Sequence, residues 1–593
     1  MPRAAEGPRS LATGSTWSSP GLGRWARGRA AGPSTGNDSP QHGTDLVSTR
    51  AILLLSRWLP PGLILLGILL RLVQYLANRS LWVDEALLAS NIVDKSPLEL
   101  LGPLDKYPVA PQVAPLGFLF LARGAVDAFG PVEYALRLVP LVAGIAALPL
   151  FYEVAKASVR PRAVPLALGL FAISHPLIYY ASEVKQYSSD VAGALVLQVA
   201  ALHLLSRTPS PGRLTVLAIA GVVLIWVSHP AIFVLAGIGT TLAVLHLTTG
   251  RPPRPGGLFL VGTSWILSFL ANHAIHLRHA VRHAGRSPYW SDFWRDAFMP
   301  WPPVSFDALA WFPRTFFEIF AEPGGLALSG VAALAFVVGT ASAIARRRVQ
   351  LLLILSPLAF ALLASGLRQY PFGGRLLLFA VPSFLLLIAE GVEEIHSKTD
   401  VRLLGPALTA LLLFHPVVCA AYHLIRPEGR EEIKPVLSHV SRHRRPGDVV
   451  YLYYGARWAF DFYADRYGLR EDDVIQGTAS RGNWRRYGRE LGGLRGRGRV
   501  WVLFSHVHAA SGVDEEAFFL YYLDAIGQRL DVIRAPGAAA YLYDLSGASP
   551  GTGDPVRSPA ATPPPSACCP EGAPLDACRG ISTPPTPFSW TGG

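Results

Sequence analysis

Long apolar segments recur along the chain from residue 59 to residue 425, with short polar loops between them. A helix needs about 20 mainly apolar residues to cross the roughly 30 Å hydrocarbon core of a bilayer. This criterion predicts about eleven membrane-spanning helices, at residues 59–77, 134–155, 163–181, 190–206, 213–228, 231–249, 257–277, 325–345, 349–366, 374–392 and 402–425. The pattern therefore indicates a polytopic α-helical membrane protein.

Basic residues are concentrated in alternate loops between these segments. Lys156, Arg160 and Arg162 separate the second and third segments, and three arginines separate the eighth and ninth. Because basic loops tend to stay in the cytoplasm, we expect a cytoplasmic N-terminus, with the first loop (78–133) and the C-terminal region outside. Segment 115–129 is then expected to lie at the membrane surface, since a crossing there would place the basic loops outside.

The composition agrees with a membrane protein and argues against a soluble enzyme or a nucleic-acid-binding protein. Of the 593 residues, 51% are hydrophobic and only 16% are charged, which is too apolar for an ordinary soluble enzyme. The net charge of +12 lies largely in the short loops, so nucleic acid is not an expected partner. The four cysteines show neither a disulfide framework nor zinc-ligand spacing. We expect an integral protein of the cell (inner or plasma) membrane.

Three regions lie outside the membrane domain, which we place at residues 51–427. Residues 1–50 and 547–593 are rich in Pro, Gly, Ser and Ala and predict a disordered cytoplasmic arm and a disordered tail. Residues 428–546 contain strand-like runs, such as 448–454 and 499–504, that alternate with helical patterns. They predict a small external α/β domain.

An adjacent carboxylate pair, Asp84 and Glu85, follows the first predicted span. The derived topology puts this pair on the same side of the membrane as segments 182–190 and 370–375, which also carry charged residues. Acidic residues commonly begin helices, where they interact favourably with the helix dipole, so a simple capping role is the competing interpretation.

Several segments in this order resemble the GT-C glycosyltransferases, and most of all the family 39 enzymes, which include protein O-mannosyltransferases and aminoarabinose transferases. The resemblance covers residues 59–205 well, with a further anchor later in the chain. The segments that carry it are Leu81–Ala86, Ala114–Phe120, Phe129–Arg137, Ser174–Ser188 and Tyr370–Arg375. The chain departs from the family at Ala114-Pro115, where a polar or basic residue usually precedes two prolines.

The resemblance implies inverting transfer of a sugar from a polyprenyl-phosphate carrier to an acceptor hydroxyl on the external face. The acceptor could be a protein, a lipid or a glycan. Asp84, with Glu85 beside it, is the expected catalytic group, because a hydroxyl needs a general base to attack at neutral pH. Basic groups are expected to stabilise the leaving phosphate, and polar or aromatic groups to hold the substrates. The candidate substrate-binding residues are Lys185, Arg368, Arg375, Glu183, Gln186, Tyr187 and Tyr370.

Other interpretations stay open for the function and for single residues. A lipid or saccharide transporter or flippase would share the composition, and a glycan ligase or polymerase with a diphosphate-linked donor would share the fold. Glu183 and Lys185 could be a solvated pair at the bilayer edge. The aromatic external loop, residues 278–322, predicts either an interfacial belt or a lid.

Three histidines, His276, His279 and His283, fall with His273 on one arc of a helix. Imidazoles on one face can bind a divalent metal, and some GT-C enzymes use one. A basic interfacial helix explains the same pattern and is the favoured interpretation. No metal or other cofactor is therefore expected to be required.

Overall fold

The computed structural model describes residues 41–547, apart from 109, 207–209, 250–254, 286, 288–292, 471–473 and 511, and the side chains from Arg57 onward with a few further gaps. The predicted tail at 547–593, except Gly547, and residues 1–40 of the predicted arm lie outside the described residues. Residues 1–57 form a unit separate from residues 58–593. Helix α1 (Gln41–Leu76) begins within the range predicted to be disordered, because residues 44–59 contain no glycine or proline.

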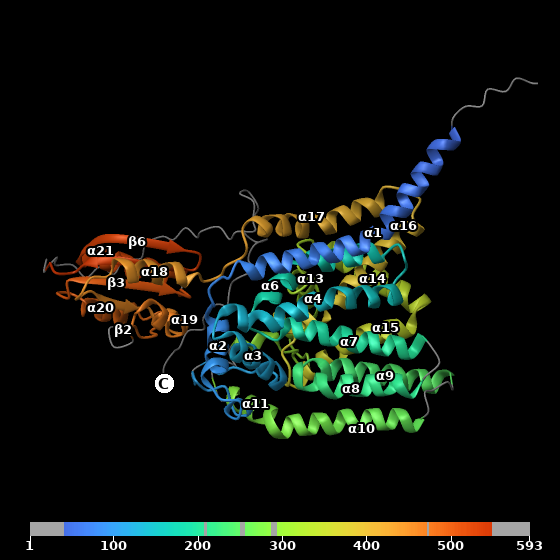
Figure 1. Cartoon of the computed structure of the whole chain (residues 1–593), viewed down its shortest axis with the longest axis horizontal. Coiled ribbons are helices and arrows are strands. Elements are labelled where there is room, and N and C mark those ends of the chain that lie inside the picture. The colour runs from blue at the N-terminus through green and yellow to red at the C-terminus, as the bar shows by residue number, and fades with distance from the viewer. Residues whose placement is uncertain are drawn as a thin grey trace, which may run out of the picture. The chain divides into compact units, whose positions relative to one another are not determined.

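The second unit consists mainly of long apolar helices that run side by side (Figure 1). By length and composition, nine helices in the described residues can span a membrane, and the bent pair α5–α6 provides a tenth. Each of the predicted spans coincides with one of these or with the shorter apolar helix α8, which confirms the polytopic helical class. Besides α1, the helices are α4 (Glu133–Ser158), α5 (Val164–Ile173), α6 (His175–Tyr179), α7 (Tyr187–Ser206), α8 (Pro211–Val227), α9 (Ala231–Thr249), α10 (Pro255–Asn272), α14 (Ser329–Arg346), α15 (Arg348–Gly366), α16 (Val381–Lys398) and α17 (Leu404–Ile425).

Glycines allow a close contact between helices α14 and α16. A Cβ atom on Gly391 would lie 1.8 Å from the carbonyl oxygen of Ala335, and one on Gly339 would lie 1.9 Å from that of Leu387. Small residues let helix backbones approach where lipid provides no hydrophobic drive for association. The 3₁₀ helix η5 (Gly374–Ala380) leads into α16 and packs against α7.

The first loop contains two short helices, α2 (Val83–Asp94) and α3 (Leu116–Phe129). The 14 residues of α3 are too few to span a bilayer, as the sequence predicted. Arg123 on α3 donates to the carbonyl oxygens of Ile92, Val93 and Lys95 at 3.1, 3.0 and 2.6 Å. This guanidinium therefore caps the C-terminal end of α2 and fixes α3 against it.

The aromatic loop at 278–322 also contains helices, α11 (Arg278–Ala284) and α13 (Phe306–Ala321). A π-helical turn, η3 (His273–Leu277), joins α10 to α11. Part of this loop lies outside the described residues, and its role as a belt or a lid stays a prediction.

The C-terminal region forms the predicted α/β unit around one five-stranded sheet with strand order β2-β1-β3-β7-β6. Strands β1, β2 and β3 are parallel, and β6 and β7 are antiparallel to their neighbours. Alternate residues of β3 face opposite layers: Trp501 and Leu503 lie in the core with α18 and α19, and Val502 lies in the core with α20 and α21. The elements are α18 (Ile433–His443), β1 (Val449–Leu452), α19 (Arg457–Tyr463), β2 (Val474–Gln476), α20 (Trp484–Gly492), β3 (Arg499–Ser505), α21 (Glu515–Ile526), β6 (Gln528–Ala535) and β7 (Ala538–Asp544), with a small hairpin of β4 (Ala509–Ala510) and β5 (Val513–Asp514).

Candidate active site

Asp84 lies in the first turn of α2, where two cations from distant segments hold its carboxylate. Lys185 Nζ lies 3.0 Å from Oδ1, and Arg375 Nη2 lies 2.8 Å from Oδ2. Lys185 also donates to Gln112 Oε1 at 2.7 Å. Burial raises the pKa of Asp84, but the adjacent guanidinium and ammonium groups outweigh burial and lower the pKa to about 2. Asp84 is therefore ionised at neutral pH, and its single negative charge faces the two positive charges of Lys185 and Arg375.

Glu85 points to a different environment, because adjacent residues on a helix lie about 100° apart. Its side chain is fully buried and pairs with two buried arginines. Oε2 accepts from Arg79 Nη1 at 3.1 Å and from Arg137 Nη2 at 2.7 Å. Oε1 accepts from Arg137 Nε at 2.9 Å and from the Val184 backbone N–H at 2.8 Å. Both oxygens are occupied, so Glu85 joins α2, α4 and the segment that carries Lys185.

Glu183 is a second buried carboxyl group close to Asp84 in the fold. Trp82 Nε1–H donates to its Oε1 at 3.3 Å, and Oε2 has no hydrogen-bond partner in the described part of the chain. Burial raises the pKa of Glu183 above its ordinary value, and the nearby Arg430 offsets this only in part. The Arg430 guanidinium lies 4.7 Å from the ring centroid of Trp82, and that of Arg375 lies 5.9 Å from it. Two arginines and Lys185 therefore surround this part of the site.

Two more of the predicted residues lie beside this charged group. Arg375 Cζ lies 5.8 Å from the ring centroid of Tyr187, which packs edge-on against Tyr180. Gln186 is buried, and its Oε1 has no hydrogen-bond partner among the described residues. Each of these residues precedes or begins α7, so this helix positions them.

The other two predicted residues have different contacts among the described residues. Arg368 is exposed, with its guanidinium 5.3 Å from the ring centroid of Phe298. Its backbone has a positive φ of 58°, which directs the chain away from α15. The Tyr370 hydroxyl donates to the carbonyl oxygen of Leu376 at 2.8 Å. Among the described contacts, neither residue touches Asp84 or its cations.

Residues of the C-terminal region clamp the backbone that enters α2. The first N–H groups of a helix have no partner inside the helix. Here side chains of the C-terminal region accept hydrogen bonds from the first N–H group of α2 and from two N–H groups just before the helix. The pairs are Ser80 N–H with Glu432 Oε2 (3.0 Å), Leu81 N–H with the Tyr463 hydroxyl (2.9 Å) and Val83 N–H with Glu431 Oε2 (2.9 Å). The C-terminal region therefore fixes the start of the helix that carries Asp84.

Two of the three histidines considered as metal ligands, His276 and His279, have other contacts. His276 is buried between two backbone carbonyl oxygens, 3.2 Å from that of Leu101 and 3.0 Å from that of Ala114. His279 Nε2 accepts from the adjacent arginine at 3.1 Å. The described residues contain two clusters of His and carboxylate groups close enough to share an ion, and neither includes His276, His279 or His283.

Comparisons with known proteins give likeness at the level of the fold. No protein-family model matches the chain, and no curated protein matches it. Similar solved structures include ArnT from Cupriavidus metallidurans bound to undecaprenyl phosphate, at 11% identity and a TM-score of 0.45, covering 81% of this chain and 98% of ArnT. They also include the archaeal oligosaccharyltransferase AglB from Archaeoglobus fulgidus in complex with an inhibitory peptide and a dolichol-phosphate. The identity is 10% and the TM-score 0.47, and the match covers 82% of this chain and 74% of the AglB chain. The roles of residues in this chain rest on the geometry described above.

Sequence reasoning missed Arg430, Gln112 and Trp82. A topological signal was present for Arg430, because it follows the last predicted span closely and so belongs to the side of the membrane predicted for Asp84. Trp82 lies within the motif that was singled out, but a tryptophan beside a membrane segment is too common to indicate a site. Gln112 carries no local signal.

Proposed function

We propose that this protein is an integral-membrane glycosyltransferase that moves a sugar from a polyprenyl-phosphate carrier to an acceptor hydroxyl on the external face of the membrane. One observation carries the proposal: the Asp84 carboxylate, in the helix that follows the first membrane helix in the chain, lies between Lys185 and Arg375, at 3.0 and 2.8 Å. A base next to a set of cations is what transfer from a phosphate-linked donor requires.

The low pKa of Asp84 makes it a weak base while both cations face it. A donor phosphate that bound Lys185 and Arg375 would share their charge, because cations bind phosphate oxygens as readily as carboxylates. The proton affinity of Asp84 would then rise in the loaded site alone. This coupling would delay proton abstraction until the donor is in place.

The proposed step is a single displacement. The acceptor oxygen forms a bond to the anomeric carbon as the bond from that carbon to the phosphate oxygen breaks. The electron pair of the broken bond leaves with the phosphate, where Lys185, Arg375 and Arg430 stabilise the charge. The acceptor proton passes to Asp84, and the anomeric configuration inverts. Glu85 acts as a positioning residue, because its oxygens are already occupied.

Glu183 provides a specific alternative for the proton acceptor. Its buried carboxyl group has an unpartnered oxygen and a raised pKa, which suits a base near neutral pH better than a pKa of about 2 does. We assign the role of base to Asp84 because it pairs directly with two of the proposed phosphate-binding cations, Lys185 and Arg375. Separate Asp84→Asn and Glu183→Gln variants distinguish the two assignments.

The first experiment compares the cell-envelope glycans of cells with and without this protein, and then of cells complemented with variants. Asp84→Asn is expected to accumulate in the membrane as the wild type does and to restore none of the missing glycan. The matched control is Asp94→Asn, at the other end of α2, where the carboxylate pairs with Lys106 and is about half exposed. Full restoration by Asp84→Asn would exclude Asp84 as the base.

The second experiment measures binding of a polyprenyl phosphate to the purified protein in detergent. Lys185→Met is expected to weaken binding at least about tenfold, since a charged hydrogen bond contributes about 1.5–3 kcal/mol. Lys156→Met, which removes an exposed pair with Glu153, is the control and should leave binding unchanged. Equal affinity for the wild type and Lys185→Met would contradict the proposed phosphate site.

A further inference from the structure

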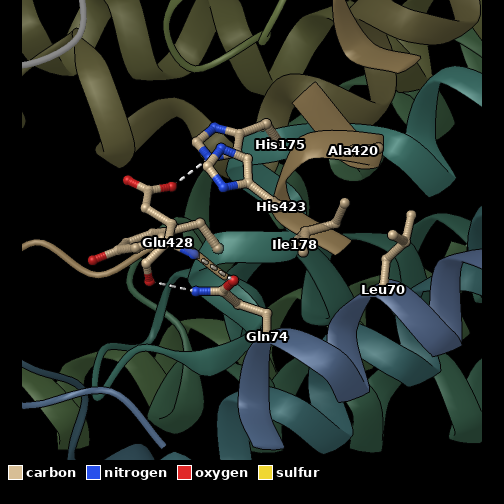
Figure 2. Close-up of a pocket in the computed structure, with 8 residues that line it drawn as sticks. Leu70, Gln74, His175, Ile178, Ala420, His423 and Glu428 are labelled. Atoms are coloured by element: carbon tan, nitrogen blue, oxygen red, sulfur yellow. Dashed lines mark hydrogen bonds and ion pairs between the residues drawn. The ribbon is translucent and has the colours of Figure 1, made fainter. Parts of the chain in front are cut away.

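Two imidazoles and one carboxylate from separate segments converge at a place distinct from the Asp84 site. His175 begins α6, His423 lies near the end of α17, and Glu428 lies in the connection that follows α17. Each side chain offers one ligand atom, and these atoms all lie within 4.8 Å of one another. Figure 2 shows the two rings beside each other, with the Glu428 carboxylate directed at them.

The three groups line a small cavity with otherwise mostly apolar walls. Its volume is about 10 Å³, and Leu70 and Ile178 are among the residues that line it (Figure 2). A cavity of this volume holds about one water-sized particle. The space therefore has room for a single ion or water molecule.

Neighbouring groups orient the potential ligands before any ion arrives. His423 Nδ1 lies 3.2 Å from the backbone carbonyl oxygen of Arg426, which orients its ring. Metal-binding histidines commonly donate their second N–H to such a carbonyl. The Gln74 side chain donates to the Glu428 carbonyl oxygen at 2.8 Å and accepts from the Glu428 N–H at 3.0 Å. These bonds hold the Glu428 backbone in place.

A histidine–glutamate ion pair is the simpler reading of part of this cluster. His175 Nε2 and Glu428 Oε2 are hydrogen-bonded, and Arg430 Nε lies 3.8 Å from Glu428 Oε1. An ion pair explains neither the second ring nor the cavity. The rings of His175 and His423 stack with centroids 4.8 Å apart and planes at 28°. Both imidazoles therefore lie close to the Glu428 carboxylate. A cation that replaces the shared proton would satisfy all three groups at once.

We propose that His175, His423 and Glu428 bind one divalent transition-metal ion of the zinc type, with a fourth position open to water. Two imidazoles and a carboxylate are a common ligand set for Zn²⁺, whereas Mg²⁺ and Ca²⁺ prefer oxygen ligands alone. In a tetrahedral site with bonds of about 2.0–2.1 Å, ligand atoms lie about 3.3 Å apart. Side-chain shifts would have to bring the more distant ligand atoms closer and to separate the hydrogen-bonded His175–Glu428 pair.

The ion would fasten α17 to two segments that lead into the proposed active site. Helix α6 leads through Ser182 to Glu183 and Lys185, and Glu428 precedes Arg430, Glu431 and Glu432 closely in the chain. Metal binding would fix the position of Arg430 and of the residues that clamp the start of α2. The metal-site proposal does not depend on the proposed sugar transfer, and a measurement of metal binding alone tests it.

The test uses the purified full-length chain in detergent, stripped with a chelator, dialysed against Zn²⁺ and analysed by mass spectrometry for metal content. We expect about one Zn²⁺ per chain for the wild type. His423→Gln and Glu428→Gln are expected to weaken Zn²⁺ binding at least about 100-fold, since loss of even an indirect partner of a metal site costs about 10–100-fold. Zn²⁺ should raise the melting temperature of the wild type and not that of these variants.

A second cluster of imidazole and carboxylate groups among the described residues, formed by His439, His443 and Asp531, provides a matched control. His443 is exposed, so His443→Gln should fold normally and keep both the zinc stoichiometry and the thermal shift. Folding of all variants is checked by size-exclusion chromatography and circular dichroism without metal. The proposal is overturned if the wild type binds no Zn²⁺, or if His443→Gln loses the ion while His423→Gln keeps it.

Discussion

The strongest consequence of the site geometry concerns the neighbour of Asp84. Glu85 is completely buried, and the side chains of its partners Arg79 and Arg137 are only 3% and 2% exposed. Glu85→Gln keeps the size of the side chain but removes the negative charge, and its amide N–H₂ would face donors on both arginines. Two guanidinium groups would then lie buried without an anion.

The loss of stability expected for Glu85→Gln follows from the burial of Glu85, Arg79 and Arg137. Removing one partner of a buried ion pair costs about 3–5 kcal/mol, because an uncompensated charge stays behind. We therefore expect Glu85→Gln to lower the free energy of unfolding by about that amount. Asp94→Asn on the same helix removes a pair whose side chains are 35% and 49% exposed, and its expected cost is at most about 1 kcal/mol.

The assay is denaturant-induced unfolding of the purified protein in detergent, followed by tryptophan fluorescence, for the wild type and both variants. The measured quantity is the change in unfolding free energy relative to the wild type. A Glu85→Gln protein within about 1 kcal/mol of the wild type would refute the reasoning, since the buried arginines would then have tolerated the loss of their anion.

Three further outcomes follow from the structure. Because the pKa of Asp84 is lowered from 3.8 to about 2, its stabilising contribution is complete above about pH 4 and is lost as the pH falls toward about 2. The difference in unfolding free energy between the wild type and Asp84→Asn should narrow over that range and stay constant from about pH 5 to 7. Tyr463→Phe leaves the Leu81 N–H without its acceptor at a cost of about 1–3 kcal/mol, so hydrogen exchange of that amide should quicken at least about fivefold. Unchanged exchange would contradict the proposed clamp. Gly391→Ala places a methyl group 1.8 Å from a carbonyl oxygen of α14 and should prevent stable accumulation in the membrane, whereas Gly330→Ala, whose methyl group meets nothing within 4 Å, should behave as the wild type. Equal accumulation of the two glycine variants would show that α14 and α16 are not packed as closely as described.

The sequence by itself determined the helical framework and the neighbourhood of the site. A membrane span is a local property, since the length of one apolar run decides it, and the predicted spans and the α/β character of the C-terminal region are confirmed on that basis. The alternation of basic loops also grouped Asp84 with Lys185 and Arg375 before any contact was known.

Only the tertiary structure decided which groups meet. Asp84 and Glu85 are neighbours in the chain, yet one lies between Lys185 and Arg375 and the other is enclosed by buried arginines. The direction of each side chain depends on which face of α2 packs inward, and that depends on residues far away in the sequence. The same holds for the His175 cluster, whose members come from three segments. Long-range packing sets these contacts, and no local pattern of residues encodes it.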